Sequence, residues 1–233
     1  MSEIDELKKE IAELKMENEK LKSELKALKD EKFKGDLDFK LNSIYEFVES
    51  EKQKQKKEEE KMKKLDLIHE ELKKEELNKI AKWINPKFRF NFELIFKKTR
   101  DGDTAKVFHE LCDNKGPTVT LIETNVGLKF GGFRNDSWNT SGWARNPDDF
   151  VFSIDFNKMY GIKDKNKDTA FGHIDRGPVF GNDTFYGDIV FHKNLNFGRC
   201  GNNVYKTNLE PNGGQNLFKT KELEVYAVQI VSV

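Results

Sequence analysis

The chain has 233 residues, of which 41 are Lys or Arg and 41 are Asp or Glu, so its formal net charge is zero. This balance lacks the positive excess that attracts the phosphates of nucleic acid or an acidic membrane surface. No run of about eighteen apolar residues occurs, so a membrane-spanning helix is not predicted. We therefore expect no nucleic-acid partner and no membrane insertion.

The first 31 residues carry a heptad repeat that is typical of a coiled coil. Leucine recurs every seven residues at position d, and a second set of residues recurs at position a. The eight residues predicted to form this seam are Ile4, Leu7, Ile11, Leu14, Asn18, Leu21, Leu25 and Leu28. Glutamates occupy all the g positions and lysines all the e positions.

This charge pattern favours a parallel pair of identical helices. In a parallel dimer a g residue such as Glu10 faces the e residue Lys15 of the second copy, and every such pair is opposite in sign. An antiparallel homodimer would set Glu against Glu. Asn18 can hydrogen-bond to its own copy only in a parallel, in-register dimer, at a cost in stability. The alternative is an amphipathic helix folded onto the chain's own body.

A leucine zipper also suggests DNA binding, but such proteins carry a basic helix directly before the zipper. The sequence has no basic helix before Glu3, so we do not expect this function. The N-terminus is acidic and unlike a signal peptide, and only two cysteines occur. A cytoplasmic location with free thiols is the expectation that follows.

Three regions are predicted. Residues 1–34 form the parallel dimeric leucine zipper, residues 35–85 a charged helix or linker, and residues 86–233 a β-rich domain. In the second region the heptad seam becomes polar at Glu51, Gln55 and Glu58. Apolar residues return after Met62, and Asn85-Pro86 is expected to end the helix, because a residue before proline avoids helical geometry.

Long charged runs end at residue 86, and most of the 19 phenylalanines follow. We expect a short helix over residues 92–99 and a second helix after Asp103 or Thr104, either of which can cap it. The predicted strands are residues 118–124, 128–133, 150–156, 184–192 and 223–233, which turn residues separate. The predicted fold class is α+β, an N-terminal helical coiled coil followed by a two-sheet antiparallel β-sandwich with flanking short helices.

Few residues suggest catalysis or metal binding. His109 and Cys112 have the spacing of two zinc ligands on one helix face, and His192 and Cys200 are able to complete a set. A buried free cysteine in a core is the simpler interpretation. Hydrolase and nucleotide-binding motifs are absent from the sequence. We predict no catalytic residues, no cofactor and no metal.

Several short motifs, taken in order, make residues 90–233 resemble the TLDc domain family. They include Phe108-His109, Cys112-Asp113 and the strand-like Phe150–Ile154. The motif residues, which we expect to be structural, are Arg100, Asp101, Gly102, Gly116, Pro117, Gly131, Gly132, Trp138, Gly177, Pro178 and Gly181. The sequence departs from the family pattern at Asp103, which replaces a phenylalanine, and in a lysine-rich loop over residues 162–169. We expect these departures to leave the fold intact and to change the partner contacts that the family pattern implies.

The resemblance implies a β-sandwich without established catalytic residues, a role in oxidative-stress protection, and in some members binding to the vacuolar proton-pumping ATPase. Our main expectation is therefore a non-enzymatic, dimeric protein-interaction protein. Two alternatives remain at this point. The first is a redox-active or hydrolytic stress-protective enzyme that uses Cys112 or Cys200, and the second is a ligand-binding β-sandwich.

Overall fold

The computed structural model describes residues 3–30, 36–182, 187–207 and 210–232. It contains two compact units, Met1–Glu75 and Glu76–Val233. The first unit is helical, and the second is dominated by antiparallel strands. The predicted α+β class, helices followed by antiparallel β structure, is confirmed.

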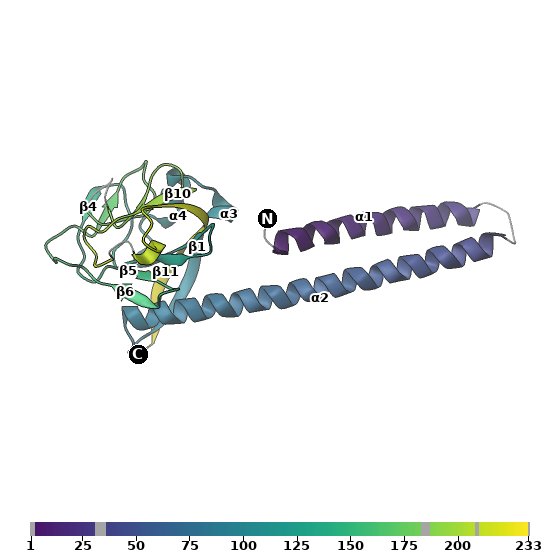
Figure 1. Ribbon diagram of the computed structural model, residues 1–233, viewed down its shortest axis with the longest axis horizontal. Helices are drawn as coiled ribbons and strands as arrows, with labels where there is room; N and C mark the ends of the chain where they lie inside the picture. The colour runs from purple at the N-terminus through teal and green to yellow at the C-terminus, as the bar shows by residue number, and fades with distance from the viewer. Residues whose placement is uncertain (1–2, 31–35, 183–186, 208–209, 233) are drawn as a thin grey trace. The chain divides into compact units, whose positions relative to one another are not determined.

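The helical unit consists of α1 (Glu3–Asp30) and most of α2 (Asp36–Ile84). Both helices are rich in Lys, Glu and Leu, which have high helix propensity, and neither contains Gly or Pro. α2 is one continuous helix of 49 residues. Within the unit α1 runs back alongside α2 (Figure 1). Residues 31–35, between the two helices, lie outside the described residues.

The second unit begins with β1 (Arg89–Lys97), where part of the predicted helix over residues 92–99 is wrong. Phe90, Phe92 and Leu94 alternate along one face of this strand. They pack against a core cluster that includes Ile80 and Phe152, here called the second core cluster. A register shift between Leu94 and Phe96 breaks the alternation. The apolar residues Phe92, Ile95 and Phe96 have the spacing of one face of a helix, which is why the sequence predicts a helix there. Only the short α3 (Lys98–Asp101) is helical.

The predicted second helix is confirmed as α4 (Ala105–Cys112). Thr104 caps it, because its Oγ1 accepts a hydrogen bond from the Val107 backbone nitrogen at 3.4 Å. Phe108 and Cys112 are buried in the larger of the two core clusters, which also contains Phe130 and Phe191 and is here called the first core cluster. This packing holds α4 against the sheet.

The strands form one hydrogen-bonded path of antiparallel pairs in the order β4-β7-β8-β9-β10-β11-β2-β3-β5-β6, and β1 pairs with β11. β2 has the predicted bounds, and the other predicted strands coincide at least in part with observed ones. Residues 184–186 of the predicted strand 184–192 lie outside the described part. The remaining strands are β2 (Thr118–Thr124), β3 (Lys129–Arg134), β4 (Gly142–Ala144), β5 (Phe150–Ser153), β6 (Lys158–Tyr160), β7 (Ala170–Gly172), β8 (Val179–Phe180), β9 (Ile189–Phe191), β10 (Phe197–Cys200) and β11 (Leu217–Ser232).

β11 joins the two halves of the predicted sandwich. Its first residues pair with β10, where Gly198 lies opposite Phe218, and its later residues pair with β2, where Leu223 lies opposite Ile122. The two sheets are therefore continuous through one long strand. The larger core cluster lies between them and contains Phe130 from β3 and Phe191 from β9.

A second core cluster covers the other face of β2, β3 and β5. The last turns of α2 supply its cover: Ile80 is fully buried there, with Leu77 and Ile84 packed beside it. The Trp83 and Phe152 ring centroids are 5.8 Å apart. Both faces of these three strands are therefore covered, and nearly all of their residues are buried, the polar ones included.

Candidate functional site

The seam predicted on α1 faces α2 within the single chain. Its eight residues are the only described residues of α1 that are not exposed. The Lys15 ammonium lies 3.4 Å from the Glu59 carboxylate, and the Lys29 ammonium lies 5.4 Å from the centre of the Tyr45 ring. From the first contact to the second, the residue number rises by fourteen on α1 and falls by fourteen on α2. The two helices therefore pair in an antiparallel direction.

The middle of this helical hairpin is polar. Asn18 lies three residues after Lys15, so the antiparallel register places it beside residues 55–58 of α2. Asn18 is only 4% exposed, and neither its amide nitrogen nor its amide oxygen has a hydrogen-bond partner. Gln55 Nε2 and Glu58 Oε2 are buried and unpaired as well. An unpaired buried polar group destabilises a structure by about 1–3 kcal/mol.

A fourth polar residue, Glu51, is buried on the same face of α2 with an exposure of 3%. Its carboxylate pairs with Lys54 at 2.5 Å, a neighbour on the same helix. The α2 seam therefore presents Glu51, Gln55 and Glu58 to a stretch of α1 that offers leucines and one asparagine. At this point along the hairpin, the buried polar side chains of the two helices do not pair with each other.

The suggested zinc ligands serve other roles. His109 is 5% exposed, and its Nδ1 lies 2.8 Å from the Asp113 carboxylate. Its Nε2 lies 2.9 Å from the carbonyl oxygens of both His173 and Arg176. His109 thus ties α4 to a distant loop. Across the residues that the structure describes, no group of three His, Cys, Asp or Glu side chains is placed to hold a metal ion.

The two cysteines are unsuited to nucleophilic chemistry. Both are free and buried, and burial raises the pKa of each thiol above its usual range. Because the thiolate is the reactive form, thiols of this kind are inert at neutral pH. Cys112 and Cys200 both belong to the first core cluster, where they act as small apolar side chains.

Two buried aspartates hold loops in place. Asp188 accepts hydrogen bonds from the backbone nitrogens of Asn203, Val204 and Tyr205 at 2.7–3.2 Å. Asp149 accepts one from the Asn135 backbone nitrogen, and burial raises the pKa of both carboxyl groups to about 6. Each carboxylate orders its own loop.

Several motif residues occupy positions that only glycine fits. A Cβ atom at Gly131 would lie 1.9 Å from the Thr120 carbonyl oxygen, and one at Gly132 would lie 2.4 Å from the Phe180 ring. Gly102 and Gly181 adopt positive φ angles of 123° and 107°. These glycines allow strands and side chains to approach closely.

The other motif residues also serve the fold. Trp138 is fully buried, donates to Thr118 Oγ1 at 2.9 Å, and lies under the Arg134 guanidinium at 4.7 Å. Arg100 pairs with its neighbour Asp101 at 2.7 Å. Gly177 would place a Cβ 2.4 Å from Leu195. Further motif residues, at turns or in loops, are Gly116, Pro117 and Pro178.

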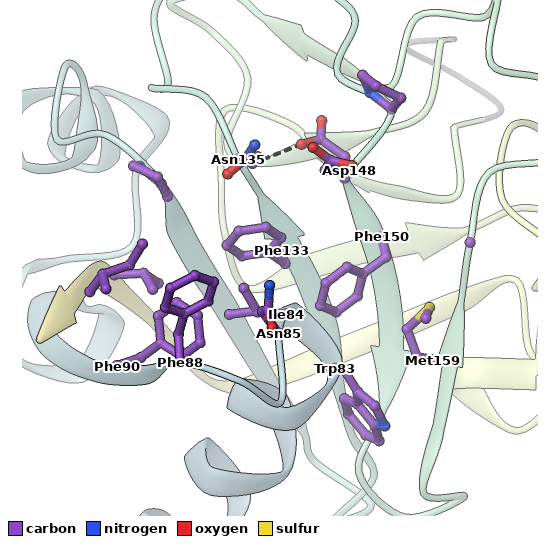
Figure 2. A pocket seen from close by; sticks show the side chains of 16 residues that line it. Trp83, Ile84, Asn85, Phe88, Phe90, Phe133, Asn135, Asp148, Phe150 and Met159 are labelled. Atoms are coloured by element: carbon purple, nitrogen blue, oxygen red, sulfur yellow. Dashed lines mark hydrogen bonds between the residues drawn. The ribbon is translucent and has the colours of Figure 1, made fainter. Parts of the chain in front are cut away.

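A groove of about 490 Å³ lies where the last turn of α2 meets the sheet (Figure 2). Phe133 and Phe150 form part of its wall, with ring centroids 5.2 Å apart. Trp83 lies at one end, and Asn135 and Asp148 lie at the opposite end. Its volume is within the range of ligand sites in proteins, about 300–1,000 Å³, and aromatic side chains form much of its lining.

Sequence reasoning missed this groove. Its lining residues come from segments that are distant in the sequence, and only one local signal was present: Trp83, Phe88 and Phe90 flank the helix end at Asn85-Pro86. Asn85-Pro86 predicts the end of the helix, and the aromatic residues on either side of it indicate no specific contact by themselves. All three line the groove.

Among the described residues, no helix combines the length and the apolar character that a membrane crossing requires.

A family model described as the TLDc domain matches residues 69–229, more than half of the chain. The match begins in α2 and ends in β11, so it includes the helical turns that cover the second core cluster. No curated protein matches the chain.

Proposed function

This chain belongs to the TLDc domain family, and from that premise we propose that it is a non-enzymatic protein-interaction protein that pairs with a second copy of itself through α1. A parallel, in-register dimer of α1 presents two TLDc domains. Two weak contacts with one partner assembly then combine into a stronger one, provided that both engage at once.

The poor match between α1 and α2 is the observation that carries the self-pairing proposal. In the hairpin Asn18 is buried with both amide atoms unpaired, and Gln55 and Glu58 face the same level. In a parallel dimer Asn18 meets the amide of its own copy, and the leucines of the seam meet leucines. Self-pairing therefore satisfies groups that the hairpin leaves unsatisfied.

Self-pairing through this seam requires α1 to leave α2, since one face cannot contact both. This gives up the hairpin ion pair between Lys15 and Glu59, which joins largely exposed side chains and contributes little, and it uncovers Val48 and Met62 of α2. In the dimer Lys15 gains Glu10 of the second copy instead. We propose that the hairpin is the form of the isolated chain and that pairing replaces it as concentration rises.

The absence of enzymatic activity is proposed on the chemistry of the candidate residues. Both thiols are buried with raised pKa values, and His109 is fully engaged in holding α4. No observation favours the redox or hydrolytic alternative. Family membership supports a role in oxidative-stress protection and binding to the vacuolar proton-pumping ATPase as the candidate partner.

Disulfide trapping tests the self-pairing. Ile11→Cys places a thiol at an a position, where two copies in a parallel, in-register pair bring it to bonding distance. Glu13→Cys, on the exposed face of α1, is the matched control. We expect a covalent dimer with Ile11→Cys and little with Glu13→Cys. Equal trapping of both variants, or of neither, would contradict the proposal.

A further inference from the structure

The groove in the TLDc domain has a chemical character that selects its partner. We infer that it binds a protein segment that presents a bulky apolar side chain next to a lysine or arginine. This inference deepens the interaction role proposed above by naming the chemistry of the partner, and it does not require the dimer. Its residues all lie within the unit Glu76–Val233.

Apolar contact is the first requirement. Trp83, Phe88 and Phe90 form half-exposed walls, and Phe133 and Phe150 lie between them and the polar end (Figure 2). Aromatic rings left partly open to water in a hollow of about 490 Å³ gain from covering by another apolar group. A large aliphatic or aromatic side chain fits this space.

The charge in the groove is the second requirement. Of the residues that the structure describes, the charged ones that line it are Asp148 and Asp149, and no described lysine or arginine does. Asp149 is buried, and its carboxylate is engaged by the Asn135 backbone nitrogen and Thr169 Oγ1, each at 2.7 Å. Asp148 is exposed, and its carboxylate forms no ion pair with any residue that the structure describes.

A free carboxylate at the end of an aromatic groove attracts a cation that reaches it from an apolar body. Lysine and arginine have this form, because their aliphatic stems lie along apolar surface while the charged group extends beyond it. An arginine also pairs with a carboxylate through two hydrogen bonds. An acidic or purely apolar segment would leave Asp148 uncompensated.

The rim of the groove favours a protein segment over a small molecule. Met159 is 42% exposed and Ile230 is 63% exposed, so apolar surface continues outside the hollow. Small-molecule sites instead bury most of the ligand within a closed cavity. A peptide chain crossing the groove covers both the hollow and its rim.

The test is a selection from a random-peptide library displayed on phage, panned against the full chain. We expect enrichment of peptides that carry Lys or Arg beside an aromatic or large aliphatic residue. A selected peptide is then titrated against the 15N-labelled protein. The indole N–H signal of Trp83, assigned with Trp83→Phe, and the amide signals of Phe133 and Phe150 should shift.

Matched variants separate charge from general surface effects. Asp148→Asn should weaken binding of the selected peptide roughly three- to ten-fold, whereas Asp136→Asn, an exposed aspartate that does not line the groove, should leave it unchanged. Replacing the Lys or Arg of the peptide with Glu should weaken binding at least as much. The effect of Asp148 should shrink at high salt.

Three outcomes would overturn the inference: no enriched peptide, enriched peptides that lack the apolar–basic pair, or a peptide that shifts signals away from the groove. The last outcome would leave the interaction role intact and remove only the groove. Sedimentation of the same Asp148→Asn protein reports self-pairing separately, because α1 is not altered.

Discussion

The Lys15 ammonium lies 3.4 Å from the Glu59 carboxylate, a contact that sets α1 antiparallel to α2 within one chain. The same lysine occupies the e position that would face Glu10 of a second copy in a parallel dimer. One residue thus has two alternative partners of the same charge. Substitutions in α1 or in α2 therefore shift the balance between the two pairings.

Removing the amide from the seam should loosen control over the number of paired helices. For Asn18→Leu we expect more stable α1 helices and oligomers that are no longer confined to dimers, because the buried asparagine specifies register and strand number. Sedimentation equilibrium and the helical circular-dichroism signal measure both effects. Glu19→Leu, on the exposed face, is the control. An unchanged parallel dimer would remove the role assigned to Asn18.

Improving the hairpin should weaken the dimer. Gln55→Leu with Glu58→Leu removes two buried polar groups from α2 without changing the α1 seam. If each group destabilises the hairpin by about 1–3 kcal/mol, dimer dissociation should become at least about tenfold easier. Lys57→Leu with Glu60→Leu, on exposed positions at the same spacing, controls for added apolar surface. A dimer of equal or higher affinity would show that the hairpin does not compete with it.

The TLDc domain should fold without the α1 seam. Leu14→Ala with Leu21→Ala removes roughly 2 kcal/mol of apolar burial per side chain, so we expect monomers with a disrupted hairpin. The unit Glu76–Val233 should still melt cooperatively, since its two core clusters contain no residue of α1. Glu13→Ala with Lys20→Ala is the exposed control. Loss of cooperative melting in the double leucine variant would show that the two units depend on each other.

Asp149 should make the stability of the domain depend on pH. Burial raises the pKa of Asp149 from 3.8 to about 6, so the folded domain holds a proton that the unfolded chain has already lost. This contribution is complete below a pH of about 4 and is lost as the pH rises through 6, a change of roughly 3 kcal/mol. The unfolding free energy of wild type minus that of Asp149→Asn should fall by most of this amount, about 2 kcal/mol, between pH 4 and pH 7. A constant difference would contradict it.

Burial raises the pKa of Asp188 as well, but we expect replacement of this carboxylate by the amide of asparagine to destabilise the domain. Its two carboxylate oxygens accept from three backbone nitrogens and from Thr207 Oγ1, and an asparagine would turn an N–H group toward one of these donors. We expect Asp188→Asn to lower the unfolding free energy by roughly 1–3 kcal/mol at neutral pH. Asp136→Asn, an exposed aspartate, should have little effect. Denaturant titration measures both, and equal stability would argue against this network.

Local patterns predicted much of the β domain. β2 was predicted with its bounds because turn residues precede it and apolar side chains alternate within it. α4 was predicted because Thr104 caps an amphipathic segment. β1 was mistaken for a helix because the register shift between Leu94 and Phe96 disturbs the period of two. A pattern read from neighbours fails where the strand itself is irregular.

Long-range contacts set the limits of the sequence reasoning. The heptads identify which residues of α1 form a seam, and they do not identify the surface that the seam contacts. The groove is a second example, because Trp83, Phe133 and Phe150 come together only once α2 has packed on the sheet. Ile80, a fully buried residue of α2, packs in the core cluster that joins the helix to the sheet.

The most direct test of the central claim is a distance measurement between spin labels on the full chain, placed singly at Glu6 or at Ala27, both exposed residues near the two ends of α1. A parallel, in-register dimer brings each label within about 30 Å of its own copy, since paired helix axes lie about 8–10 Å apart. An antiparallel pair of α1 helices would separate both end labels by roughly 30–40 Å along the helix axis. We predict short intermolecular distances at both positions. No intermolecular distance at any concentration, or a long distance at both ends, would contradict the account.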